Sequence, residues 1–151
     1  MSDFSIRYHG LTHLKEIPTQ NNVKLSVRNE LRWDAATEEK RDEVNFLAIK
    51  GQGVRFGAPV AVDWAFPADN ELPVLLDAFV RHVDVTQQSR RLLRDFQELV
   101  ITCEPRPWLV LGWVFSDAGA HGYATFRKDD TTITATFAHS DAFAVIRNEL
   151  G

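Results

Sequence analysis

Histidine, serine, aspartate and cysteine are the side chains of this sequence that could hold a metal or carry catalysis. His9 and His13 are four residues apart, the spacing that places two zinc ligands on one face of a helix in metalloproteases. Gly10 follows His9 directly, no glutamate stands between the two histidines, and the flanking residues have no helical pattern. We therefore interpret both as polar side chains of a loop, and the sequence predicts no metal site.

His139, Ser140 and Asp141 have the residue types of a catalytic triad, but they are consecutive. Triad members come from separate elements and meet in space, so three neighbouring side chains cannot form the relay. A Ser-Asp pair is instead typical of a helix start, where Ser caps the first turn and Asp faces the positive end. Cys103 is the single cysteine, and its strand-like neighbours indicate a buried, unreactive thiol. No catalytic residue is predicted.

The Gly51-Gln52-Gly53 segment is too short for a phosphate-binding loop. It predicts a hairpin turn between strands at 44–50 and 54–66, because glycine tolerates the positive φ of tight turns. Pro59 lacks a backbone donor, which predicts that the second of these strands lies at an edge or is bulged. No cofactor site is predicted.

Residues 34–43 are the most charged segment, with five acidic and two basic side chains. They predict a solvated loop or a short exposed helix that joins two strands. Their functional interpretation is a complement to a basic partner, because facing charges speed association and help to specify the partner. Two tryptophans stand at strand ends, where an aromatic ring can be exposed. The predicted partner-binding residues are Trp33, Asp34, Glu38, Glu39, Asp42, Glu43 and Trp108.

The composition is that of an ordinary globular domain: 151 residues, 44% hydrophobic, 25% charged and a formal net charge of -4. Nucleic-acid binding needs clustered Lys and Arg, which this chain lacks, so a basic protein is the better partner. The first residues lack a signal peptide pattern, no apolar run could span a bilayer, and a single cysteine fits a reducing compartment. We therefore expect a cytoplasmic protein that does not bind membranes.

Apolar and polar residues alternate over 3–9, ending at Gly10, and over 22–33, which predicts two half-buried strands. Residues 71–83 carry one apolar stripe at helical spacing, with Asn70 as the expected N-cap. Residues 86–97 are more polar and predict a loop with one or two helical turns.

The second half predicts strands at 99–103, 108–115, 123–127 and 132–138, and a closing helix after Ser140. Residues 108–115 are apolar on both faces, which is typical of a central strand. Tight turns between most strands favour antiparallel pairing. The sequence thus predicts a single α+β domain over 1–151, with a largely antiparallel β-sheet and two main helices packed on one face.

Glu71-Leu72, Leu75-Leu76 and Phe79 form an amphipathic helix, and a strand over 99–105 ends in Glu104-Pro105. Strands and a final helix follow. In this order, residues 44–151 resemble WapI-like immunity proteins of bacterial toxin systems. Thr102 departs from the aromatic that this family tends to have, and Arg106 replaces its Asn. The resemblance implies a small antitoxin that binds and blocks a cognate toxin domain without a cofactor, and it brings no catalytic residue.

The leading hypothesis is therefore a protein-binding inhibitor, an immunity protein against a basic bacterial toxin. A second hypothesis is a small-molecule or peptide-binding module, with an apolar pocket near Trp64, Trp108 or Trp113. A third is a structural or assembly protein, for example of a phage particle. An enzyme comes last, since it would need a cleft that gathers distant His, Cys and carboxylate groups. The oligomeric state stays open.

Overall fold

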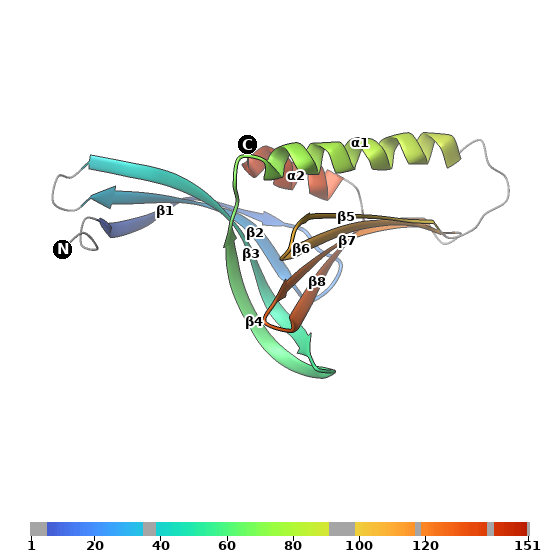
Figure 1. Ribbon diagram of the computed structural model, residues 1–151, viewed down its shortest axis with the longest axis horizontal. Coiled ribbons are helices and arrows are strands. Elements are labelled where there is room, and N and C mark those ends of the chain that lie inside the picture. Colours follow the sequence, from blue (N-terminus) through green and yellow to red (C-terminus); the bar gives the residue numbers. More distant parts are fainter. Residues whose placement is uncertain (1–5, 35–38, 91–98, 117–118, 139–140, 151) are drawn as a thin grey trace.

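The computed structural model describes residues 6–34, 39–90, 99–116, 119–138 and 141–150. The first half of the chain contains β1 (Ile6–Ile17), β2 (Lys24–Asp34), β3 (Glu39–Arg55), β4 (Ala58–Pro67) and the helix α1 (Leu72–Arg90). The second half contains β5 (Leu99–Arg106), β6 (Leu109–Ser116), β7 (Gly119–Lys128), β8 (Thr131–Phe137) and the helix α2 (Asp141–Leu150). The chain is thus one α+β domain rich in strands (Figure 1).

The described strands belong to one antiparallel sheet with the order β1-β2-β3-β8-β7-β6-β5, and β4 pairs with β3 outside this path. The long strand β3 joins the two halves of the sheet. It pairs with β2 along its first part and with β4 along its last part, and its residues Val54 and Arg55 pair with β8. The strand β6 lies between β5 and β7 and is buried on both faces, which confirms the predicted central strand.

The core forms where the alternating apolar faces of the strands meet the stripes of the two helices. Phe143 of α2 is fully buried and lies edge-on to Phe79 of α1, with ring centroids 5.2 Å apart. Its ring also lies 5.4 Å from Phe137 of β8. Burial of one such side chain stabilises the fold by roughly 1.5–3 kcal/mol. The predicted stripe of α1 is confirmed, since it buries Leu72, Leu76, Phe79 and Val83.

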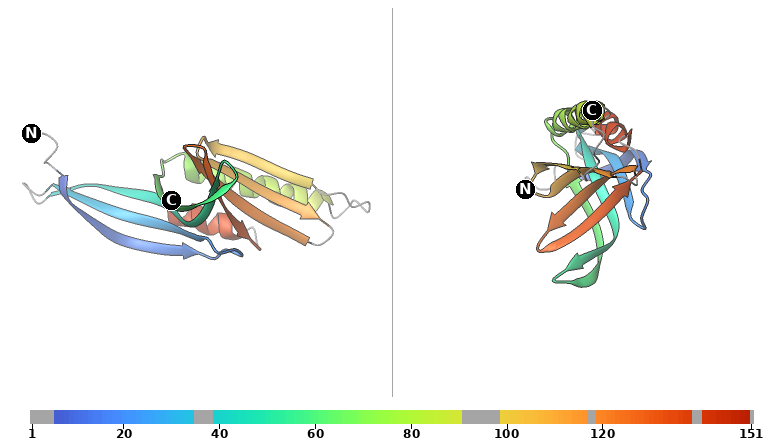
Figure 2. Two further views of the ribbon diagram at one scale, coloured as in Figure 1. Left: turned by 90° about the horizontal axis from the view of Figure 1, so that it is seen from below. Right: turned by 90° about the vertical axis from the view of Figure 1, so that its right-hand side faces the viewer.

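The helices cover only part of the sheet. They lie side by side, and β1, β2 and β3 run well beyond them to one end of the molecule (Figures 1 and 2). The element order and the strand pairing confirm the predicted α+β class and antiparallel sheet. The sheet, however, is larger than the area that the two helices cover.

The predicted hairpin turn at Gly51-Gln52-Gly53 is wrong, because β3 runs through it to Arg55. Gly51 and Gly53 instead allow neighbouring backbone segments to approach β3 closely. A Cβ on Gly53 would lie 2.5 Å from the carbonyl oxygen of Thr132 on β8, and one on Gly51 would lie 3.2 Å from the carbonyl oxygen of Asn22. The hairpin turns at Phe56-Gly57, where β4 begins one residue later.

Other boundaries also differ from the prediction. Gly10 does not end β1 but pairs with Leu31 inside it. The helix α1 continues to Arg90, because 84–90 contain neither Gly nor Pro to stop it. Its cap is Asp69 rather than Asn70, since the Asp69 Oδ1 accepts from the backbone N–H groups of Glu71 and Leu72, both at 2.9 Å.

Candidate protein-binding surface

The predicted acidic surface lies at the end of the sheet that projects beyond the helices. The strand pairing places Asp34 of β2 opposite Glu39 of β3, and Asp42 opposite Arg32. Residues 39–43 are therefore strand, so the predicted loop or short helix is wrong for them, while Glu38 lies outside the described residues. In this part of the sheet β3 is paired with β2, and both strands run beyond the two described helices (Figure 1).

Trp108 and Trp33 lie apart in the fold. Trp33 pairs with Lys40 in the projecting end. Trp108 is half-buried, and its ring stacks on Phe66 with centroids 4.4 Å apart and planes 2° from parallel. Because Phe66 pairs with Leu47, the stack is roughly 17 Å along β3 from Asp42 at the usual strand rise. The fold therefore does not bring Trp108 together with the acidic residues, and its stack supports the core.

The β3–β4 hairpin carries an exposed aromatic that the sequence reasoning missed. Phe56 and Gly57 form its two-residue turn, with φ values of 49° and 79°, as a type I′ turn requires. The Phe56 side chain is 79% exposed, and Val54 beside it is 49% exposed. The Arg55 guanidinium carbon lies 5.6 Å from the centroid of the Phe56 ring, a cation–π distance. An X-Gly pair between two alternating runs was the signal that could have located this turn.

Folding does not account for phenylalanine at this turn position. The left-handed conformation is unfavourable by about 1–2 kcal/mol for a residue with a side chain, and Asn or Gly fits it better. The ring gains no compensating burial, since most of its surface faces solvent. Strained residues that persist without a folding benefit are concentrated at functional positions. Residues 54–57, which we call the hairpin tip, are therefore a candidate contact surface.

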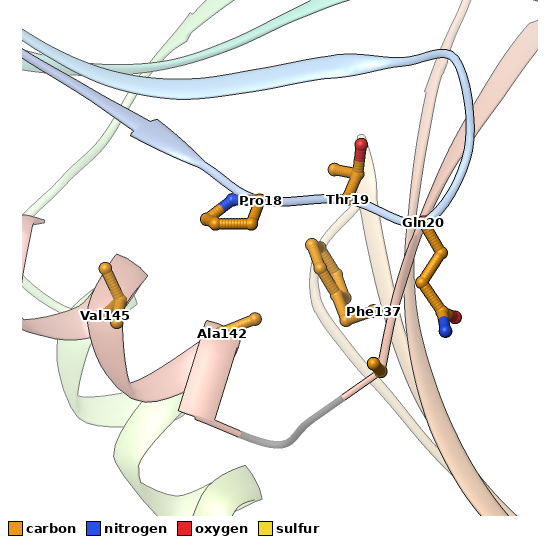
Figure 3. A pocket seen from close by; sticks show the side chains of 7 residues that line it. Pro18, Thr19, Gln20, Phe137, Ala142 and Val145 are labelled. Carbon is orange, nitrogen blue, oxygen red and sulfur yellow. The ribbon is translucent and has the colours of Figure 1, made fainter.

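An apolar pocket of about 260 Å³ lies where the β1–β2 connection meets the end of β8 and the start of α2 (Figure 3). None of its described lining residues is charged, and the hydroxyl of Thr19 is already used, donating to the carbonyl oxygens of Asn21 and Val23. None of Trp64, Trp108 and Trp113, where a pocket was predicted, lines it. The lining residues are Pro18, Thr19, Gln20, Phe137, Ala138, Ala142 and Val145.

Burial and hydrogen bonding shift the pKa of a few ionisable groups in the described part of the chain. Cys103 is half-buried rather than buried as predicted, and this partial burial raises the pKa of its thiol, which disfavours the thiolate. The hydrogen bond from Arg106 lowers the pKa of Asp69, and the two side chains fasten the start of α1 to the end of β5. Within residues 6–34, 39–90, 99–116, 119–138 and 141–150, no three His, Cys, Asp or Glu side chains are grouped as metal ligands. Neither of the described helices is long and apolar enough to cross a bilayer.

Comparisons with known proteins identify no relative of this chain. No protein-family model, no curated protein and no solved structure matches this chain. The resemblance to immunity proteins thus stays a prediction.

Proposed function

We propose that this protein acts by binding another protein, with the hairpin tip as its anchor. The observation that carries the proposal is Phe56, an exposed aromatic in a left-handed turn that neither burial nor backbone preference favours. Exposed aromatic side chains that enter a partner's pocket supply a large share of interface energy. A two-residue turn also holds the ring on a rigid element, which lowers the entropy lost on binding.

The charge of the chain favours a basic partner. Its formal net charge is -4, and four of the predicted acidic contacts, Asp34, Glu39, Asp42 and Glu43, lie in the paired strands of the projecting end. A cationic partner surface is drawn over a distance to a protein of net negative charge.

Inhibition of a bacterial toxin is the form of protein binding that fits these features together with the resemblance of residues 44–151 to WapI-like immunity proteins. An immunity protein needs a tight, charge-steered interface and no catalytic group. Binding then blocks the toxin by covering its active surface, and the acidic and aromatic surfaces supply the steering and the anchor.

The test is a co-purification of the tagged protein with the products of the genes encoded beside its own. We expect a stoichiometric complex with a basic, toxic neighbour, and rescue of cells that express this neighbour. Phe56→Ala is expected to weaken the complex at least tenfold, as removal of an aromatic anchor does. A charge-reversed variant of Asp42 and Glu43 to Lys is expected to slow association, with a smaller effect at high salt.

Val74→Ala is the matched control, because Val74 is a 67% exposed apolar side chain on α1, away from the hairpin. It should leave the complex unchanged. Equal loss of affinity in both variants, or a neighbour that neither binds nor is neutralised, contradicts the proposal.

Binding of a small apolar ligand is the second candidate, and the pocket of about 260 Å³ beside Phe137 favours it. Thermal stabilisation by small apolar compounds, lost in Ala142→Trp, would support this function. The described lining of this pocket is mostly apolar, which places ligand binding behind protein binding, since several converging polar groups normally fix a ligand's orientation.

A further inference from the structure

The outer edge of β4 is open in the described part of the chain. β4 pairs with β3 and with no other described strand, and in Figure 1 it borders the sheet. An unpaired edge presents a row of N–H and C=O groups that can pair with another chain. The predicted edge position of Pro59 is consistent with this arrangement.

The register shows which groups face outward. In a hairpin with a two-residue turn, the residues that flank the turn form a hydrogen-bonded pair, and bonded and non-bonded pairs then alternate. Arg55 and Ala58 flank the turn, so the even-numbered residues of β4 bond to β3. The bond from the Ala68 N–H to the Asn45 carbonyl, 2.8 Å long, continues the same alternation. The outward N–H groups therefore belong to Ala61, Asp63 and Ala65.

The side chains of this outward set leave room for another strand. Pro59, Ala61, Asp63, Ala65 and Pro67 are exposed, and only Asp63 among them is charged. The two prolines have no N–H to offer, so they limit pairing to the segment between them. This segment is continuous with the hairpin tip, because β4 starts directly after Gly57.

We infer that the outer edge of β4 accepts an extended segment of a partner protein, which adds a strand to the sheet with a Lys or Arg opposite Asp63. The inference rests on the proposed function and names the mode of binding. Main-chain hydrogen bonds to residues 61–65 supply affinity, and the charge of Asp63 supplies selectivity. Lys50 of β3 lies opposite Asp63 on the paired side, so the added strand approaches Asp63 from the side on which no described strand lies.

Asp63 argues against a second copy of this chain as the added strand. The outward residues read the same in both directions around Asp63, as Pro, Ala, Asp, Ala and Pro. If two β4 edges paired antiparallel with twofold symmetry, the register with the most backbone hydrogen bonds would place Asp63 opposite Asp63 of the second copy. Like charges in directly opposite positions destabilise a strand pair, and charges at edges are a known protection against self-association.

The test uses two synthetic peptides of alternating Thr and Val, one with a central Lys and the other with a central Glu. Backbone NMR of the full chain should show shifted and exchange-protected amides at Ala61, Asp63 and Ala65 when the Lys peptide is added. We expect the Lys peptide to bind about tenfold more tightly than the Glu peptide, from the change of an opposite-charge to a like-charge pair.

Two variants make the result specific. Ala61→Pro removes an outward N–H that β3 does not use, so it should abolish peptide binding while the amide spectrum of the rest of the sheet is kept. Asp63→Lys leaves the backbone intact and should reverse the preference, so that the Glu peptide binds more tightly. This second variant decides the question even if the proline disturbs the hairpin.

Three results would overturn the inference: no amide shifts in β4 at millimolar peptide, shifts confined to β1 or β5, or a dimer of the free protein that Ala61→Pro disrupts. If the peptide fails but a complex with a neighbour still depends on Phe56, protein binding stands and only strand addition falls.

Discussion

The side-chain amide of Asn21 donates to the main-chain carbonyl oxygen of Thr134 at 2.7 Å. Its carbonyl oxygen also accepts from the Thr136 N–H at 3.3 Å, and the Gln20 N–H donates to the Thr136 carbonyl at 2.8 Å. The β1–β2 connection thus completes the edge of β8 where β3 no longer pairs with it. The Asn21 side chain thus makes hydrogen bonds to β8 that a neighbouring strand would otherwise make, and these bonds link the two halves of the sheet.

Asn21→Ala should lower the free energy of unfolding by roughly 1 kcal/mol, because two hydrogen bonds are lost at an exposed site where water replaces them. Chemical denaturation measures this change. Asn21→Asp keeps the acceptor for Thr136 but loses the donor to Thr134, so it should fall between the alanine variant and the parent. Asn22→Ala, at the exposed neighbouring position, is the control, and an equal effect there would contradict the assignment.

Phe56→Asn should raise the free energy of unfolding by about 1 kcal/mol, because Asn-Gly fits a type I′ turn and Phe-Gly does not. The same variant should lose partner binding, since the anchor ring is removed. A rise in melting temperature measured by calorimetry checks the first part. A stability that falls would show that the ring of Phe56 supports the fold rather than a contact.

The start of α1 should weaken in acid. Arg106 lowers the pKa of Asp69 below its ordinary value of 3.8, which means that the folded state favours the carboxylate. The resulting stability is present above the unfolded pKa and is lost as the pH falls through the lower, folded value. The side chain of Asp69 is 52% exposed, so solvent screens the pair and the effect is small.

Melting temperatures from neutral pH to below about pH 4 measure this dependence. Asp69→Asn keeps a capping side chain but has no charge to titrate, so the slope in acid should decrease. Asn70→Ala should leave the slope as it is, because Asn70 is not the cap. A larger change at position 70 would contradict the capping role of Asp69.

Gly122→Ala should destabilise the fold by roughly 1–3 kcal/mol through overpacking. An added Cβ would lie 2.8 Å from Cε2 of Phe143 and 2.8 Å from Cε3 of Trp113, both in buried rings that cannot move freely. Denaturant titration measures the loss. Adding Phe143→Leu should recover part of it by making room, and purely additive losses would argue against this contact.

Local sequence patterns determined most of the elements. The stripe Leu72, Leu76, Phe79 and Val83 identifies α1, and the alternation of 131–137 identifies β8, because each pattern follows from one repeat of backbone geometry. These inferences need only residues near one another in the chain.

Tertiary structure decided what depends on distant residues. Gly51 and Gly53 resemble a turn locally, but they lie within β3 because the Asn22 and Thr132 backbones approach them there. The charged residues 39–43 extend β3 because β2 offers its edge. Because β3 continues to Arg55, the hairpin turn falls at Phe56-Gly57. Phe56 is exposed at this turn, and β4 pairs on one edge with β3. A glycine shows only that a side chain would not fit, and the fold determines whether a turn or a neighbouring strand is the reason.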